Sequence, residues 1–278
     1  MPRRRRSSKT STSTTRSQAK RTTSSASKTS KRTTRRRKKT INVEKYVRSI
    51  VKEVASRLGL DLLGLKDEEY YDVLGPAIEM VLGEATYKPK VEQIVSRLKR
   101  YYENVAELIA SNLLRIRESF TPEQLEFIIA YGRRAAAGHV QKLYREALRL
   151  GREDLIAQLK YVWHEYGKPT PIPCPKCGFR AVLPDLTCFV CGAVLSEKDV
   201  RKAVDFNELF KEFVETSSIS DLRETLERGY VLLGEYIKPP IAQREPWDIE
   251  IFLSKDEKEY IRKKIMEKSL RNIHGEGK

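Results

Sequence analysis

Residues 174–178 read Cys-Pro-Lys-Cys-Gly, and residues 188–192 read Cys-Phe-Val-Cys-Gly. These two units hold all four cysteines of the 278-residue chain, and ten residues separate the first unit's last cysteine from the second unit's first. Two thiolates separated by two residues can hold one metal ion from a single tight turn, and the glycine after each pair lets the backbone adopt a positive φ beneath the metal. The pattern predicts a closed tetrahedral site made by Cys174, Cys177, Cys188 and Cys191.

The connection between the two units is long enough for two short strands, which we expect at residues 180–183 and 186–189 on either side of Pro184-Asp185. Over residues 172–195 the chain resembles the zinc-ribbon family, and the resemblance stops there. It implies one structural zinc ion. Zinc ribbons occur in transcription factors, ribosomal proteins, nucleic-acid enzymes and interaction modules, so the resemblance leaves the activity open.

Iron, an iron–sulfur cluster and two disulfides are the alternatives to zinc. Disulfides suit small secreted domains, whereas this chain is long and shows no apolar export segment. Four thiolates around one ion leave no position for water or substrate, so we expect a structural metal. Phe179 and Phe189 could meet nucleic acid, but side chains so placed more often cover the metal site. Zinc binding is worth about 10–16 kcal/mol in small peptides, enough to fold a segment that buries little apolar surface.

The charge of the chain is concentrated at its start. Residues 1–40 contain sixteen of the 54 Lys and Arg residues and none of the 38 Asp and Glu residues. The remaining 238 residues therefore hold 38 side chains of each sign, and the whole formal charge of +16 belongs to the tail. The tail is otherwise mostly Ser and Thr, which cannot bury enough apolar surface to offset chain entropy. We expect residues 1–40 to be disordered in isolation.

This polycationic tail predicts a polyanionic partner, and nucleic acid is the obvious one because neutralised phosphates release condensed counterions. A solubilising or nuclear-localising arm is the alternative. An acidic membrane surface fits less well because the tail lacks aromatic residues and a lipidation signal, and a transit peptide fits less well because the tail has few apolar residues. With no secretory signal and no apolar membrane span, we expect an intracellular protein of the cytoplasm or nucleoid, or of the nucleus in a eukaryote.

Apolar residues recur at three- and four-residue steps from Val43 onward, which predicts a helical domain over residues 41–167. Thr121-Pro-Glu-Gln124 matches a capping box with proline at the first helical position, so a helix should begin there. Gly75-Pro76 should break or restart the second helix. The five expected helices cover about residues 43–58, 67–83, 90–116, 121–151 and 152–166.

The fourth expected helix carries a basic stripe. At 100° per residue, five of its cations fall within an arc of about 80° opposite the apolar face. Such a stripe could follow a phosphate backbone, although a solvated helix face is the simpler interpretation. The five are Arg134, Lys142, Arg145, Arg149 and Arg152, and the expected nucleic-acid contacts are the first four together with Arg3, Arg4, Arg5, Arg6, Arg35, Arg36, Arg37, Lys38 and Lys39 in the tail.

Residues 168–173 read Lys-Pro-Thr-Pro-Ile-Pro, which predicts a stiff linker that holds the cysteine units away from the helical domain. Beyond them, Ser196 and Ser254 begin capping boxes and Ser220 should cap a further helix. At most two short strands are expected there, at 230–233 and 249–253. The expected fold is mainly α, divided into a disordered tail (1–40), a five-helix domain (41–167), a linker (168–173), a zinc ribbon (174–195) and a mainly helical C-terminal region (196–278).

The sequence contains no recognisable catalytic motif. The three histidines are isolated and all cysteines are assigned to the metal site, which leaves no nucleophile to propose. The sequence therefore predicts a non-enzymatic nucleic-acid-binding protein, and a small-molecule substrate is not expected. DNA is favoured over RNA because the tail resembles the basic arms of chromatin and genome-packaging proteins. An interaction scaffold of the ribosome or transcription machinery, docked through the zinc ribbon, is the first alternative, and a viral genome-packaging protein is the second.

Overall fold

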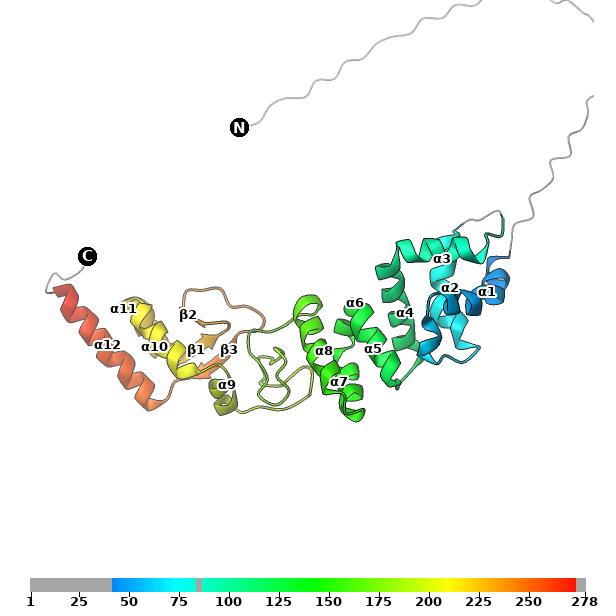
Figure 1. The fold of residues 1–278 in the computed structure, drawn as a ribbon. Coiled ribbons are helices and arrows are strands. Elements are labelled where there is room, and N and C mark those ends of the chain that lie inside the picture. The colour runs from blue at the N-terminus through cyan, green and yellow to red at the C-terminus, as the bar shows by residue number, and fades with distance from the viewer. Residues whose placement is uncertain (1–41, 84–86, 274–278) are drawn as a thin grey trace, which may run out of the picture. The chain divides into compact units, whose positions relative to one another are not determined.

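A computed structural model describes residues 42–83 and 87–273 (Figure 1). These residues form twelve α-helices, one short 3-10 helix and three β-strands, so the expectation of a mainly α fold is confirmed. The expected disordered tail lies outside the described residues.

The region before the cysteine units contains more helices than expected, because two of the five expected helices are divided. The capping box at Thr121 is confirmed, since the Thr121 hydroxyl accepts a hydrogen bond from the Gln124 amide and the Gln124 side chain bonds back. The elements are α1 (Val43–Arg57), η1 (Leu60–Leu63), α2 (Glu69–Leu82), α3 (Val91–Arg100), α4 (Tyr102–Ile116), α5 (Pro122–Tyr131), α6 (Arg133–Gly138), α7 (Val140–Arg149) and α8 (Glu153–Tyr166).

The break between α5 and α6 falls at Gly132. A Cβ at this position would lie 2.1 Å from the Cβ of Ala110, so only glycine lets α4 pack this closely. The Glu107 carboxylate then accepts hydrogen bonds from the amides of Arg134 and Ala135, at 2.7 and 3.1 Å, and caps the new helix. The prediction of one helix over residues 121–151 was therefore wrong, for a reason that lies in the neighbouring helix.

The prediction that Gly75-Pro76 breaks or restarts the second helix was wrong, because Pro76 lies inside α2 without ending it. Proline has no N–H, so one carbonyl in the preceding turn loses its partner within the helix. In the same turn, the Val73 carbonyl accepts a hydrogen bond from the buried side chain of Asn112, at 3.0 Å. Helix α4 thus contributes a polar contact where proline weakens the backbone hydrogen bonding of α2.

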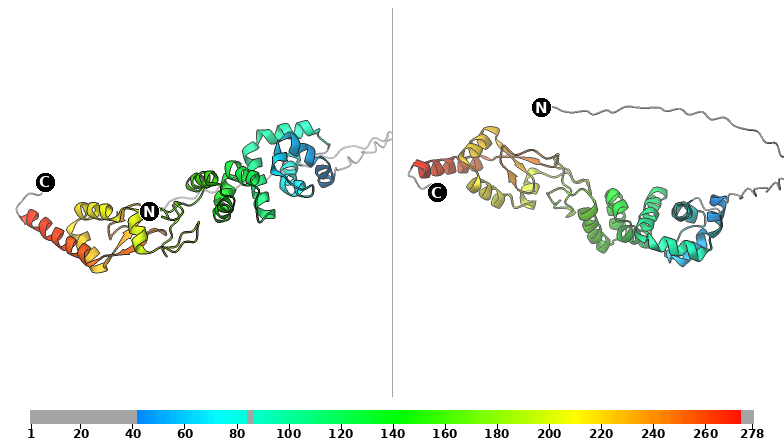
Figure 2. Two further views of the ribbon diagram at one scale, coloured as in Figure 1. Left: turned by 60° about the horizontal axis from the view of Figure 1, so that its bottom comes forward. Right: turned by 90° about the horizontal axis from the view of Figure 1, so that it is seen from above.

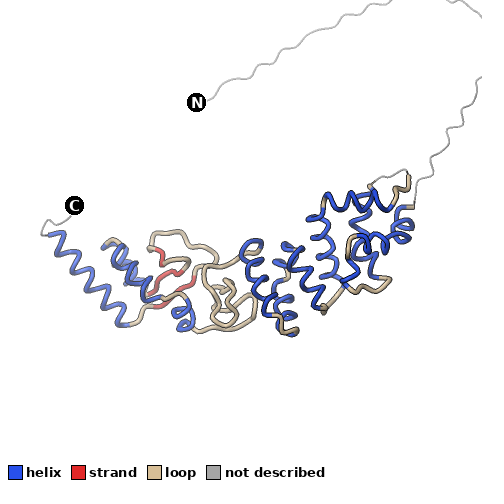
Figure 3. Tube along the Cα trace, viewed as in Figure 1, coloured by secondary structure: helices blue, strands red, loops and turns tan. Residues whose placement is uncertain are grey.

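We define residues 168–195 as the cysteine segment. It contains no continuous β-strand. Three isolated antiparallel bridges take the place of the expected strands, and they join Pro173 to Arg180, Val182 to Cys188 and Thr187 to Val194. Figure 3 draws the whole segment as loop between α8 and α9. The expected hairpin is therefore present only as single bridges, because the chain turns again at each cysteine unit.

The C-terminal region is helical around one small sheet (Figures 1 and 2). The sheet has the order β2-β1-β3 and both pairs are antiparallel, with Leu232 opposite both Lys238 and Glu250. The expectation of at most two strands was wrong, because the two-residue strand β2 is too short to produce an alternating pattern. The elements are α9 (Glu197–Ala203), α10 (Phe206–Thr216), α11 (Ile219–Arg228), β1 (Tyr230–Leu233), β2 (Ile237–Lys238), β3 (Ile249–Phe252) and α12 (Lys255–Ile273).

Serine capping boxes begin three of these helices. Those at Ser196 and Ser254 were predicted and are confirmed. The third cap is Ser218, whose hydroxyl accepts a hydrogen bond from the Asp221 amide, so the assignment of this role to Ser220 was wrong by one half-turn. The Ser220 hydroxyl instead lies 2.7 Å from that of Ser218.

Buried apolar side chains form one cluster from α1 to α12, and it includes residues of the cysteine segment. Phe179 packs edge-on against Tyr144 of α7, and Phe189 stacks on Trp163 of α8. The prediction that the proline-rich linker holds this segment away from the helices was therefore wrong. The segment is part of the same core as α7 and α8.

Candidate metal centre and candidate nucleic-acid contacts

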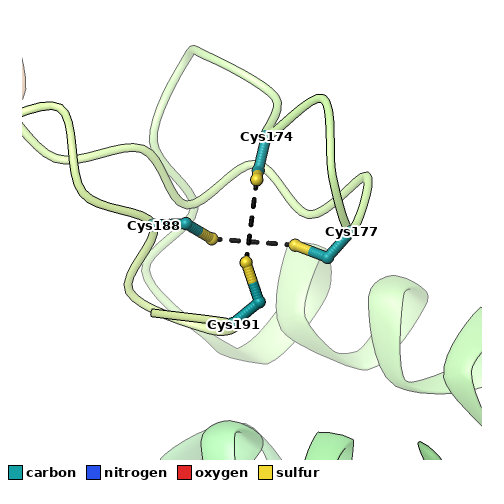
Figure 4. A group of neighbouring side chains, drawn as sticks. All are labelled: Cys174, Cys177, Cys188 and Cys191. Atoms are coloured by element: carbon teal, nitrogen blue, oxygen red, sulfur yellow. Dashed lines mark hydrogen bonds between the residues drawn. The ribbon is translucent and has the colours of Figure 1, made fainter. Parts of the chain in front are cut away.

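The four cysteines point toward a common centre (Figure 4). The sulfur atoms of Cys174 and Cys191 are 3.8 Å apart, those of Cys177 and Cys188 are 3.7 Å apart, and all four lie within 4.8 Å of one another. A tetrahedral zinc site with Zn–S bonds of about 2.3 Å requires sulfur atoms about 3.8 Å apart. The cluster is therefore able to bind a metal ion, and its dimensions are compatible with one zinc.

Each cysteine pair is held by a tight turn that ends at a glycine. The Gly178 amide donates to the Cys174 carbonyl at 2.8 Å, and the Gly192 amide donates to the Cys188 carbonyl at 2.9 Å. Both glycines have positive φ, +77° and +70°. The role predicted for the two glycines is confirmed, because a side chain at either position would be strained.

Hydrogen bonds within the cluster shift the pKa values of its thiols. A hydrogen bond from Cys177, together with the backbone amides of Cys191 and Val190, lowers the pKa of Cys188 to about 5 against the opposing effect of burial. The same contact with Cys188, followed by burial, raises the pKa of Cys177. One thiolate therefore forms readily beside the Cys177 thiol, which holds its proton more tightly, and a bound metal would displace that proton.

Helices α7 and α8 support the cluster through residues that the sequence did not single out. The Trp163 indole N–H donates to the Arg180 carbonyl at 2.9 Å, and the Gln141 side chain donates to the Phe189 carbonyl at 2.5 Å. Phe179 is buried, as expected for a residue that covers the metal site, whereas 42 % of Phe189 remains exposed. Trp163 could have been noticed in the helical pattern of α8 as a candidate support for the metal site. Nothing in the neighbouring sequence indicated that it contacts the cysteine segment.

The site is closed. Cys174, Cys177 and Cys188 are buried, Cys191 is partly buried, and their four sulfur atoms would complete a tetrahedral shell. No second group of three or more His, Cys, Asp and Glu side chains with metal-binding spacing occurs in residues 42–83 and 87–273. The arrangement can hold an ion and stabilise the segment, but it offers no open coordination position.

The basic stripe does not lie on one helix, because α6, α7 and the start of α8 share its residues. Arg134 lies in the first turn of α6, Arg145 is on α7, and both side chains are exposed. Within the part of the chain that the structure describes, no residue forms a hydrogen bond or ion pair with the Arg145 guanidinium. Arg152 is paired with Asp154 at 2.6 Å.

The Lys142 ammonium and the Arg149 guanidinium both bond to groups of the protein, although 52 % of the Arg149 side chain remains exposed. The Lys142 ammonium donates to the carbonyls of Leu114 and Arg117, at 3.2 and 2.5 Å, and so satisfies the C-terminal end of α4. The Arg149 guanidinium donates to the Phe120 carbonyl at 3.1 Å and pairs with Glu146 at 2.8 Å. Of the four predicted contacts in the helical domain, Arg134 and Arg145 have the more available side chains, and the nine tail residues lie outside the described ranges.

No helix among the described residues combines the length and the apolar composition needed to cross a membrane. Comparisons of the chain with protein families, with curated proteins and with solved structures give no match. The function is therefore inferred from the chain's own residues.

Proposed function

We propose that this protein binds nucleic acid without catalysing a reaction on it. The tail supplies sequence-independent attraction to phosphates. One zinc ion stabilises a zinc-ribbon-like segment that recognises nucleic acid or docks on a protein partner. The observation that carries the proposal is the distribution of charge: residues 1–40 hold sixteen cations and no acid, while the rest of the chain is formally neutral. A polycation gains affinity for phosphates through counterion release, irrespective of base sequence.

The cysteine cluster supports the second part of the proposal. Zinc would be held by Cys174, Cys177, Cys188 and Cys191, and it would supply folding free energy rather than chemistry, because four thiolates leave no open position. The contacts of Phe179 with α7 and Phe189 with α8 then fix the segment to the helical region. Because the helical region and the cysteine segment are linked to the tail, binding of the tail raises their effective concentration on a nucleic acid without new contacts.

The experiment compares the full-length protein with a version that starts at Thr40. This truncation removes none of the described elements, since the first helix begins at Val43 and is capped by Asn42. Binding is measured against duplex DNA, single-stranded DNA and structured RNA over a salt series. If all sixteen tail charges engaged duplex DNA, the slope of log affinity against log salt would approach about −14, and truncation should remove most of it.

Two control variants sharpen this experiment. A full-length variant with the tail sequence scrambled keeps the charge and should bind like the wild type, because phosphate attraction does not depend on the order of residues. A variant with half of the tail cations replaced by glutamine should lose about half of the slope. Equal binding by the full-length and truncated proteins, or no binding by either, contradicts the proposal.

A specific surface favours the interaction scaffold as a second candidate. The loop between β2 and β3 exposes apolar side chains, with Ile241 82 % and Trp247 37 % exposed, beside a depression of about 540 Å³ that Trp247 lines. Exposed apolar side chains that gather in one patch mark protein-interaction sites. This candidate predicts that Ile241→Ser abolishes co-sedimentation with ribosomes or RNA polymerase while leaving the affinity for naked nucleic acid unchanged.

A further inference from the structure

Two adjoining depressions lie on the surface formed by α4, α5, α6 and α8 and the cysteine segment. One has a volume of about 390 Å³ and the other about 400 Å³, and Arg134 and Tyr166 line both. We call the pair the aromatic groove. Its side chains that matter here are Tyr102, Tyr131, Arg133, Arg134, Tyr166 and Phe189.

The aromatic rings of the groove are exposed but held in place. Exposure is 42 % for Tyr102, 50 % for Tyr131, 41 % for Tyr166 and 42 % for Phe189. Tyr131 packs against Tyr102 with ring centroids 6.0 Å apart, and Phe189 is stacked on the buried ring of Trp163 at 5.7 Å. Rings fixed on one side offer the other side to a ligand at little cost in conformational entropy.

Cations lie between these rings. The Arg133 guanidinium lies 6.0 Å from the centroid of the Tyr166 ring and donates to its hydroxyl at 3.3 Å. Arg134 and Lys168 line the groove and are exposed. Two carboxylates line the depression of about 390 Å³. That of Glu107 accepts hydrogen bonds from the two amides at the start of α6. The charge of Glu103 contributes to raising the pKa of Arg133.

We infer that the aromatic groove binds single-stranded nucleic acid, with unpaired bases stacked on Tyr131, Tyr166 and Phe189 and with phosphates beside Arg133 and Arg134. This inference rests on the proposed function and names its substrate class. Exposed rings beside cations are the arrangement that binds single strands, because every base has a π face and the stacking of base pairs covers that face in a duplex. An acidic peptide would use the cations but would leave the rings without a role.

The test uses the full-length protein and a fluorescent oligonucleotide, as single-stranded DNA, as single-stranded RNA and as the matching duplex, over a salt series. Tyr131→Ala and Tyr166→Ala should each weaken single-strand binding by about fivefold or more, because one stacked base is lost. The salt slope and the duplex affinity should not change. Tyr131→Phe keeps the ring and should bind like the wild type, and Tyr236→Ala, at a 59 % exposed tyrosine outside the groove, is the matched control.

The charged residues of the groove give independent readouts. Arg133→Gln and Arg134→Gln should each make the single-strand salt slope shallower by about 0.7, whereas Glu103→Gln should increase the affinity. Photocrosslinking of an oligonucleotide that contains a halogenated uracil should map to Tyr131, Tyr166 or Phe189. Phe189→Leu preserves apolar contact with Trp163 but removes the stacking face, so weakened single-strand binding with unchanged thermal unfolding supports the inference.

Failure of the inference is distinguishable from failure of the proposed function. If the full-length protein binds none of the three nucleic acids, both fail. If it binds all three equally, loses them on tail truncation and keeps its single-strand affinity in Tyr131→Ala and Tyr166→Ala, only the inference fails. Loss of acidic-peptide binding in these variants, with single-strand binding unchanged, would assign the groove to a protein partner and overturn the inference.

Discussion

Trp163 and Phe189 stack with their ring centroids 5.7 Å apart and their planes at 19°, and this contact joins helix α8 to the second cysteine unit. The same indole donates to the Arg180 carbonyl, in the connection between the two units. One side chain therefore contacts both parts of the segment that a metal would order. The metal centre and the helical region should consequently lose stability together.

Trp163→Phe separates the hydrogen bond from the packing. The substitution keeps an aromatic ring against Phe189 but removes one of the two donors to the Arg180 carbonyl, which keeps the Thr170 amide, so the free energy of unfolding should fall by about 0.5–1.5 kcal/mol. Trp163→Ala should cost about 3–5 kcal/mol, because it also opens a cavity. Urea denaturation monitored by circular dichroism measures both. Trp247→Phe, at a partly exposed position, is the control and should change stability by less than about 0.5 kcal/mol.

Metal removal should unfold the cysteine segment. If one zinc is bound as proposed, chelation should shift the fluorescence of Trp163, release the metal in a one-to-one ratio with the chain and expose four thiols to alkylation. Cys188→Ser should abolish stoichiometric zinc, whereas Lys176→Ala, at an exposed position of the first unit, should retain it. A purified chain that contains no metal and shows two disulfides by mass spectrometry would contradict the assignment.

The cysteine site could be predicted from the sequence because its determinants are local. Each unit contains its own ligands and its own positive-φ glycine, so spacing alone is informative. The same holds for the capping boxes at Thr121 and Ser196, where the cap and its partner are three residues apart. Neither required knowledge of any other part of the chain.

The helix boundaries could not be predicted because their determinants lie elsewhere in the chain. Gly132 ends α5 where α4 brings Ala110 against it, and Pro76 lies inside α2, where the Val73 carbonyl, next to the one that proline leaves without its helical donor, accepts from the Asn112 side chain of α4. Periodicity identifies the apolar face of a helix, but it does not show which neighbour packs there. The groove was missed for the same reason, since its rings come from separate helices and from the cysteine segment.

Lys142 and Arg145 should behave differently although they are three residues apart on α7. Lys142→Met keeps the aliphatic stem but removes the donor to the carbonyls at the end of α4, so stability should fall by about 1.5–3 kcal/mol, with little change in the salt slope of nucleic-acid binding. Arg145→Gln should leave the urea midpoint nearly unchanged and, if Arg145 contacts phosphates as predicted, make the duplex salt slope shallower by about 0.9. A loss of slope in Lys142→Met at full stability would instead show that Lys142 contacts phosphates.

Glu146 should make the stability of the helical region depend on pH. Hydrogen bonds from Arg149 hold the pKa of this carboxyl below its usual value of 4.5, against the opposing effect of burial, and the Phe120 amide adds to the lowering. The unfolded chain therefore binds the proton more tightly than the folded chain does, and stability rises with pH in this range. The contribution should be complete above the unfolded pKa and should be lost as pH falls through the lower folded pKa.

The measurement is the urea midpoint of wild type and Glu146→Gln at neutral pH and at several values below 4.5. Glu146→Gln should be less stable than wild type at neutral pH, because Arg149 and the Phe120 amide lose an ionised acceptor, and the difference should shrink as the pH falls. Glu208→Gln, at an exposed position of α10, controls for the loss of one negative charge. If the difference in stability between Glu146→Gln and wild type stays constant down to the acid range, the charge of the Glu146 carboxylate does not stabilise the loop before α5. The packing of its side chain would then account for the difference.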